Sequence, residues 1–263
     1  KDFYYDTLTA IESIDNFYAN SSGTKYNNAT QGAYWTGIST GVKISNSFMS
    51  ENYSVNNPYP NNYDYPLTQT SLWAAASLAH FAAHAREFIE DREVLISEDA
   101  IDNSYDDVQS IIDKAQNAMS YAENYAWDRE EKLYYDYPTA DLSGNSFNVD
   151  TQLIGILANV RLFEATQQRI YLTTADVLID NMLIKFGDAG LGGLVRSYNA
   201  SSKDSLAKGI HYSYDNQLFV YVLSQIAEAL GYNQRNFADF WEFERSTNDY
   251  VSLAKSGLSF LNS

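Results

Sequence analysis

Three segments of this chain, 70–92, 151–165 and 216–230, are apolar on nearly every side of a helical wheel. A helix of this kind must be surrounded by other helices, because it has no polar face to turn toward solvent. The first two are followed by segments, 105–127 and 169–186, whose apolar side chains form a single stripe. The sequence therefore predicts alternating buried and half-exposed helices.

The three buried segments also begin alike. Asp150 and Asp215 each precede a Gln by two residues, and Thr68, which directly precedes Gln69, is a candidate cap for the first segment. These residue types are typical N-caps. Repeated hairpins bury one helix of each unit when the units stack side by side. We therefore expect an all-α fold, an α/α toroid or partial toroid of about four helix hairpins, with long aromatic loops gathered at one end.

Part of this pattern resembles a known family. The resemblance is clear over about 150–230 and fainter over about 65–150. It is to the α/α-toroid proteins of the six-hairpin glycosidase type, which include glycoside hydrolases, sugar epimerases and unsaturated-uronyl hydrolases. It implies a ring of hairpins and a carbohydrate-active protein. The residues that carry it are Asp150-Thr151-Gln152-Leu153-Ile154, Phe163-Glu164-Ala165-Thr166, Tyr171-Leu172-Thr173-Thr174-Ala175, Phe186-Gly187-Asp188 and Gly192-Gly193.

Composition excludes several classes of function. We expect one domain over 1–263, with a loop-rich insertion at 20–66. A net charge of −17 with only 17 Lys and Arg argues against nucleic-acid binding, which needs clustered basic residues. No apolar run approaches the roughly 20 residues of a membrane span. The absence of cysteine excludes disulfides and thiolate chemistry. We expect no cofactor, and the oligomeric state stays open.

The surface composition favours an extracellular or cell-surface location. The chain is rich in Asn, Ser and Tyr and poor in Lys, and it begins with Lys1, which predicts that a preceding signal segment has been removed. Glycosylation sequons begin at Asn20, Asn28, Asn52 and Asn199. A chain this rich in Asn, Ser and Thr contains several sequons by chance, so they carry little weight.

Asp150 and Asp215 are the first catalytic candidates. If the buried helices lie side by side, both carboxylates face the same end of the domain. Hydrolysis of a glycosidic bond needs one carboxyl group to protonate the leaving group and one carboxylate to activate water. In inverting enzymes the two lie about 6.5–9.5 Å apart. The simpler alternative is that both residues only cap their helices, and the two interpretations are compatible.

Aromatic loops provide candidates for sugar binding. The chain contains 22 tyrosines, and many of them precede the buried helices. Sugar rings stack their C–H faces on aromatic rings, and phenol hydroxyls add hydrogen bonds. The alternative is that these rings only pack the loops onto the helix ends. The predicted sugar-binding residues are Tyr65, Gln69, Tyr134, Tyr135, Tyr137, Gln152, Tyr198, Tyr212, Tyr214 and Gln217.

Histidines offer weaker signals. His211 lies between Ile210 and Tyr212 and is a candidate proton-abstracting base, although a polar loop histidine is the simpler interpretation. His80 and His84 have metal-ligand spacing, but the zinc-protease pattern needs Glu where Phe81 stands. We therefore predict no metal site.

The residues together predict an extracellular protein that binds glycans and hydrolyses them. A non-catalytic cell-surface protein, used for sugar binding or surface assembly, is the alternative. A polysaccharide lyase or sugar epimerase centred on His211 is a third possibility.

Overall fold

The computed structural model describes residues 68–90, 98–136, 146–188, 193–199, 204–205, 211–236 and 246–261. The insertion predicted at 20–66 and the fourth hairpin lie outside the described residues. The described helices are α3 (Thr68–Glu90), α4 (Glu98–Tyr125), α5 (Val149–Thr166), α6 (Arg169–Phe186), α7 (Ser213–Asn236) and α8 (Thr247–Leu261). None of them is long and apolar enough to cross a membrane.

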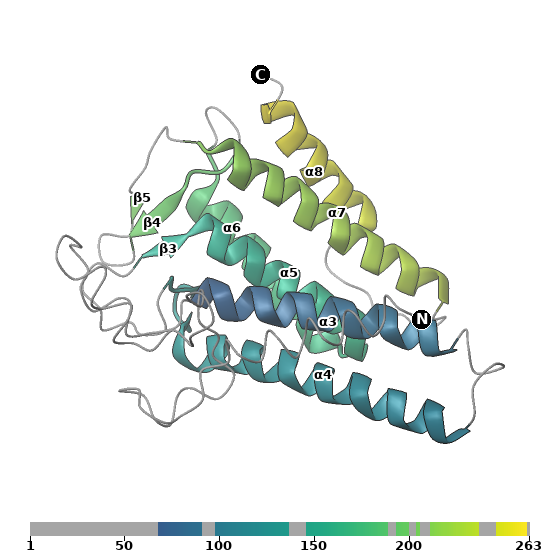
Figure 1. The fold of residues 1–263 in the computed structure, drawn as a ribbon. Helices are drawn as coiled ribbons and strands as arrows, with labels where there is room; N and C mark the ends of the chain where they lie inside the picture. The colour runs from purple at the N-terminus through teal and green to yellow at the C-terminus, as the bar shows by residue number, and fades with distance from the viewer. Residues whose placement is uncertain are drawn as a thin grey trace, which may run out of the picture.

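The helices form three antiparallel hairpins, α3–α4, α5–α6 and α7–α8 (Figure 1). Helix α5 packs against α3 on one side and α7 on the other, so α3, α5 and α7 make an inner row. These three helices run in the same direction and begin at the end where the short strands lie (Figure 1). The predicted all-α arrangement of hairpins with inner helices starting at a common end is confirmed.

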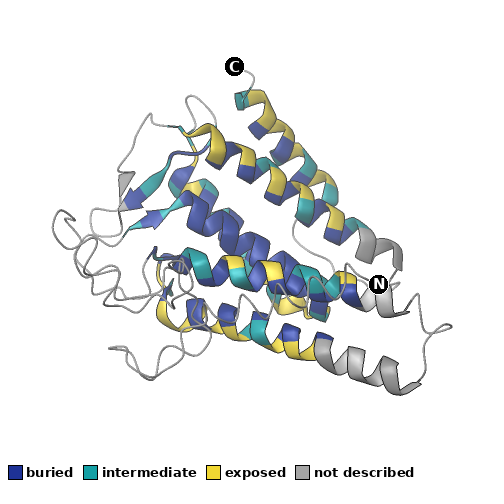
Figure 2. Cartoon of the chain, in the orientation of Figure 1, coloured by how far each residue is buried: buried dark blue, intermediate teal, exposed yellow. Residues whose placement is uncertain are grey.

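Burial follows the predicted alternation in the hairpin of α5 and α6, whereas α3 and α7 are less buried than predicted (Figure 2). Every residue from 149 to 163 of α5 is buried, whereas α6 buries a single stripe that contains Leu172, Leu178 and Phe186. Helices α3 and α7 keep one exposed row each, because among the described helices each has an inner neighbour on one side only. The exposed residues are Trp73, Ser77 and His84 on α3 and Ser213, Tyr214, Gln217, Tyr221, Ser224 and Glu228 on α7.

Short antiparallel strands connect the helices at this end. β1 (Trp127–Asp128) pairs with β2 (Leu133–Tyr134), and β3 (Phe147–Asn148), β4 (Ser197–Asn199) and β5 (Asp204–Ser205) form a second small sheet in that order. Gln152 fixes β2 to α5: its Oε1 accepts the backbone N–H of Tyr134 at 2.7 Å and its Nε2 donates to the carbonyl of Tyr134 at 2.7 Å. Much of the predicted long loops lies outside the described residues.

Candidate functional site

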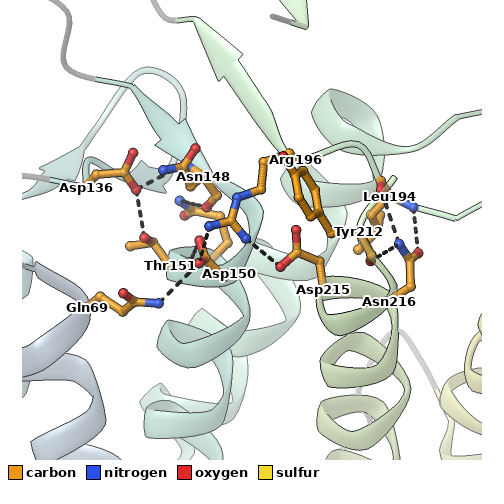
Figure 3. A network of polar contacts seen from close by, with 11 residues as sticks. Gln69, Asp136, Asn148, Asp150, Thr151, Leu194, Arg196, Tyr212, Asp215 and Asn216 are labelled. Atoms are coloured by element: carbon orange, nitrogen blue, oxygen red, sulfur yellow. Dashed lines mark hydrogen bonds and ion pairs between the residues drawn. The ribbon is translucent and has the colours of Figure 1, made fainter. Parts of the chain in front are cut away.

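Asp150 and Asp215 meet at one guanidinium group, that of Arg196 (Figure 3). Arg196 Nη2 lies 2.8 Å from Asp150 Oδ2, and Nη1 lies 2.6 Å from Asp215 Oδ1. Gln69 Nε2 also donates to Asp150 Oδ2, at 3.3 Å. We call Gln69, Asp150, Arg196 and Asp215 the Arg196 network. It joins the first turns of α3, α5 and α7, and the catalytic roles of the two acids stay predictions.

A shared guanidinium limits the distance between the two carboxylates. Its two terminal nitrogens are held in one rigid plane about 2.3 Å apart. With the two hydrogen-bond lengths added, the bound oxygens of Asp150 and Asp215 lie within about 8 Å of each other.

The N-cap interpretation is wrong for both acids. Helix α5 begins one residue before Asp150, so Asn148 occupies the N-cap position, and its side chain makes no capping hydrogen bond. Helix α7 begins at Ser213, which places Asp215 third in the first turn. Thr68 is itself the first residue of α3, and its hydroxyl has no hydrogen-bond partner among the described residues. The helices begin earlier than the apolar pattern does.

The neighbour of Asp215 in sequence, Asn216, positions the segment that carries Arg196. Its Oδ1 accepts the N–H of Leu194 at 2.8 Å, and its Nδ2 donates to the carbonyl of Leu194 at 3.3 Å. Gly193 has a φ of 71°, in the left-handed region that favours glycine, and a Cβ there would lie 2.7 Å from Asn216 Oδ1. Sequence reasoning missed Arg196, because it is one of three basic residues before the start of α7, with Lys203 and Lys208, and nothing in the sequence distinguishes it from the other two.

Asp215 is fully buried, and only one of its carboxylate oxygens has a partner. Oδ1 binds Arg196, whereas Oδ2 has no hydrogen-bond partner among the described residues and points toward Tyr212 (Figure 3). Burial raises the pKa of Asp215; Arg196 opposes this rise, and the charge of Asp150 adds to it. A buried carboxyl group with a raised pKa and a free oxygen is suited to hold a proton.

A third acid, Asp136, lies beside Asp150 and was also missed. It accepts hydrogen bonds from the Thr151 hydroxyl at 2.7 Å, the Ser146 hydroxyl at 2.9 Å and the Asn148 N–H at 3.2 Å. Burial raises its pKa to about 6; these hydrogen bonds oppose the rise, and Asp150 adds a smaller repulsion. No spacing pattern in the sequence marks this residue.

Three predicted sugar-binding residues belong to the core instead. Tyr134 and Gln152 are 0% exposed, and Tyr198 is 3% exposed. The Tyr134 ring packs edge-on against Trp127, and the Tyr198 ring stacks on Phe147. For these residues the alternative interpretation holds, since they pack the connecting segments onto the helix ends.

Other predicted sugar-binding residues remain accessible. Tyr212 and Tyr214 are 50% and 56% exposed, and Gln217 is exposed. The Tyr212 ring lies 5.4 Å from the Arg196 guanidinium carbon, beside the Arg196 network. Tyr135 is half-buried and donates its hydroxyl proton to Asp128. Two further predicted residues, Tyr65 and Tyr137, lie outside the described residues.

The whole arrangement resembles solved carbohydrate-active enzymes. A GH76 α-mannanase from Bacteroides thetaiotaomicron superimposes with a TM-score of 0.58 and 16% identity, over 97% of this chain and 54% of the enzyme. The fold is all-α, an α/α toroid or partial toroid. A cellobiose 2-epimerase from Spirochaeta thermophila is more distant, with a TM-score of 0.42, 13% identity and coverage of 71% and 43%. A GH76 mannosidase from Bacteroides thetaiotaomicron superimposes with a TM-score of 0.44 and 12% identity, over 79% of this chain and 64% of the enzyme.

The sequence itself gives no closer match, since no family model and no curated protein matches it. The chain spans about half the length of the α-mannanase that it resembles. At this level of identity the likeness shows the toroid fold and leaves the chemistry to the site.

His211 lies outside the Arg196 network of this toroid. Its Nδ1 is 3.1 Å from the Leu194 carbonyl, its Nε2 is 3.2 Å from Asp188 Oδ2, and its ring packs against Phe260. Both nitrogens therefore contact protein groups, as expected for a polar loop histidine, and a role as a base stays a prediction.

The spaced histidine pair shows no metal-site geometry. The rings of His80 and His84 contact each other edge-on at 4.5 Å. Burial, then Arg161 and His84, lower the pKa of His80 to about 4, so this ring is neutral at pH 7. Within the described ranges, no group of three or more His, Cys, Asp or Glu side chains could hold a metal ion.

Proposed function

We propose that this chain binds glycans and hydrolyses a glycosidic bond at the Arg196 network. The observation that carries the proposal is the meeting of two buried carboxylates, Asp150 and Asp215, at the common end of the inner helices. The α/α-toroid fold, shared with an enzyme described as an α-mannanase, supports the same class of chemistry. An extracellular or cell-surface location fits a polymeric substrate.

Their surroundings assign different roles to the two acids. Asp215 is the general acid, because burial raises its pKa and its Oδ2, which has no hydrogen-bond partner among the described residues, can carry the proton given to the leaving oxygen. Asp150 is the general base, because contacts with Arg196, Gln69 and the backbone N–H of Thr151 hold its carboxylate in place beside Asp215. The limit of about 8 Å on their separation overlaps the range of about 6.5–9.5 Å found in inverting enzymes.

The exposed side chains around the network supply the sugar-binding surface. The half-exposed ring of Tyr212 lies beside Arg196, and Tyr214 and Gln217 follow on the first turns of α7. A sugar that stacks on Tyr212 lies next to the two carboxylates. The ring contributes apolar contact, and the amide contributes directed hydrogen bonds.

The test compares Asp150→Asn and Asp215→Asn with the wild type on a panel of polysaccharides, by release of reducing ends. Each substitution removes a proton-transfer group, so we expect an activity loss of about 100-fold to 10,000-fold. Asp113→Asn, which changes an exposed acid on α4, is the matched control. Nuclear magnetic resonance of the first-formed anomer then checks inversion. Variants as active as the wild type would contradict the assignment.

One observation favours the non-catalytic alternative. The guanidinium of Arg196 pairs with both carboxylates. In a non-catalytic sugar-binding protein, the role of such an ion-paired cluster is to fix the helix starts. A wild type that binds glycans but releases no reducing ends would select this alternative. A product with a new double bond, or an epimerised sugar, would select the lyase or epimerase instead.

A further inference from the structure

Asp136 connects the beginnings of two inner helices. Its backbone carbonyl accepts the N–H of Thr68, the first residue of α3, at 3.2 Å. Its Oδ1 accepts the Thr151 hydroxyl and the Asn148 N–H at the start of α5 (Figure 3). Ser146 makes two further contacts with Asp136: its hydroxyl donates to Asp136 Oδ2, and its carbonyl accepts the Asp136 N–H at 3.0 Å.

These contacts flank two members of the Arg196 network. Thr68 is the neighbour of Gln69 in sequence, and Thr151 is the neighbour of Asp150. Gln69 and Asp150 are 81 residues apart in the chain, yet Gln69 Nε2 reaches Asp150 Oδ2 at 3.3 Å. The relative position of the first turns of α3 and α5 decides whether this hydrogen bond forms, and Asp136 contacts both turns.

The charge of Asp136 makes a purely packing role costly. Its side chain is buried, and its side-chain partners among the described residues are hydroxyl and N–H donors rather than cations. Asp150 on α5 is the charged group that acts on it, and it acts by repulsion. A buried carboxylate without a cation is tolerated only when hydrogen bonds stabilise it. An ionised group at this place offers two accepting oxygens, whereas an amide offers one.

We propose that Asp136 is a positioning residue of the hydrolytic site, which holds Asp150 against Gln69 and Arg196 through its contacts with the starts of α3 and α5. The inference rests on the proposed function. The positioning role requires the ionised form of Asp136, because its carboxylate then accepts the hydrogen bonds from Ser146, Asn148 and Thr151 at once.

The test measures the pH profile of kcat/KM for the wild type and Asp136→Asn. We expect kcat/KM to fall about tenfold at the optimum, mainly through kcat, because the base is misplaced. Burial raises the pKa of Asp136 to about 6, so the wild type should lose activity as the pH falls through this value. In the variant the midpoint of this acidic limb should move down by about one pH unit.

Asp128→Asn is the matched control. Asp128 also accepts three hydrogen bonds, from the N–H groups of Glu130 and Glu131 and from the Tyr135 hydroxyl, but it lies in β1. We expect its kcat/KM to stay within about threefold of the wild type, with an unchanged acidic limb. A uniformly lowered profile for Asp136→Asn, with its midpoint unmoved, would show a merely structural role and overturn the proposal.

Hydrogen exchange separates failure of this proposal from failure of the proposed function. A wild type that cleaves no glycan overturns the proposed function, and the role of Asp136 in hydrolysis falls with it. Amide exchange over 68–72 and 148–153 still reports the contact itself, which we expect to loosen in Asp136→Asn and not in Asp128→Asn. Unchanged exchange at both helix starts would refute the positioning contact whatever the activity.

Discussion

Two arginines connect α5 to α7, and they do so at different places along the helices. Arg196 reaches the first turns from the segment before β4. Arg161 belongs to α5 itself: its Nη1 is 2.8 Å from Glu164 Oε2, and its Nη2 donates to the Tyr221 hydroxyl at 3.2 Å and to Gln225 Oε1. We call Arg161, Glu164, Tyr221 and Gln225 the Arg161 network.

The two networks differ in charge balance. Arg161 meets one carboxylate and two neutral groups, and the second acid that acts on Glu164, Glu228, is exposed to solvent, so the buried charge of Arg161 is matched. Arg196 meets two carboxylates, has a third acid nearby in Asp136, and leaves Asp215 Oδ2 without a partner among the described residues. A matched buried ion pair fixes packing, whereas an excess of buried acids raises pKa values and is typical of sites that transfer protons. The comparison teaches that the imbalance, and not the burial alone, marks the candidate site.

The largest expected effect comes from removing each arginine in turn. Arg196→Met leaves two buried carboxylates unpaired and should lower the free energy of unfolding by about 3–4 kcal/mol. Arg161→Met leaves only Glu164, whose side chain is 23% exposed, and should cost about 1 kcal/mol. Urea unfolding at pH 7 measures both. Equal losses would break the distinction between the two networks.

The sequence predicted the regular parts of this arrangement well. The segment 169–186 matches α6 at both ends, because its apolar stripe and its flanking turn residues are local signals. The meeting of Asp150 and Asp215 followed from their equivalent places at the starts of repeated helices. Arg196 and Asp136 escaped prediction, because they lie on segments positioned by tertiary contacts, such as the hydrogen bond from Val149 N–H to the Arg196 carbonyl.

Aromatic residues show a second limit of the sequence. A tyrosine that stacks on sugar and one that packs a strand onto a helix have the same local surroundings, so Tyr134 and Tyr212 looked equivalent. A glycine carried the missing signal. Gly155 lies inside α5, where glycine costs about 1 kcal/mol, and a Cβ there would lie 2.8 Å from the Tyr134 ring. The glycine marks the tyrosine as a packing residue.

The raised pKa of Asp136 should make the stability of the protein depend on pH. Burial raises the pKa of Asp136 to about 6, above its unfolded value of about 3.9, so the folded protein holds this proton more tightly between pH 4 and pH 6. Stability should therefore fall as the pH rises through this range, by about 2 kcal/mol from this group. Asp215, whose pKa is also raised, contributes in the same direction.

Asp136→Asn should flatten this slope. We expect the stability of the wild type relative to the variant to decrease from pH 4 to pH 7, measured by urea unfolding at each pH. Asp113→Asn, an exposed substitution on α4, should follow the wild type. A constant difference between wild type and Asp136→Asn across this range would mean that the carboxyl group does not titrate in the folded protein there.

The smallest expected effect comes from a comparison of two similarly exposed tyrosines. Tyr212 is 50% exposed and lies beside Arg196, whereas Tyr221 is 45% exposed and its hydroxyl accepts a hydrogen bond from Arg161. If sugar binds only at the Arg196 network, Tyr212→Ala should weaken glycan binding by about 1 kcal/mol, roughly fivefold, and Tyr221→Ala should leave it unchanged. Isothermal titration calorimetry with an oligosaccharide measures both affinities.

A similar loss in both variants would mean that a glycan extends along the exposed row of α7, since one small sugar at the helix starts has no reason to depend on a ring two turns further along. An unchanged affinity for Tyr212→Ala would remove this ring from the binding surface, because a stacking contact cannot be lost without loss of affinity.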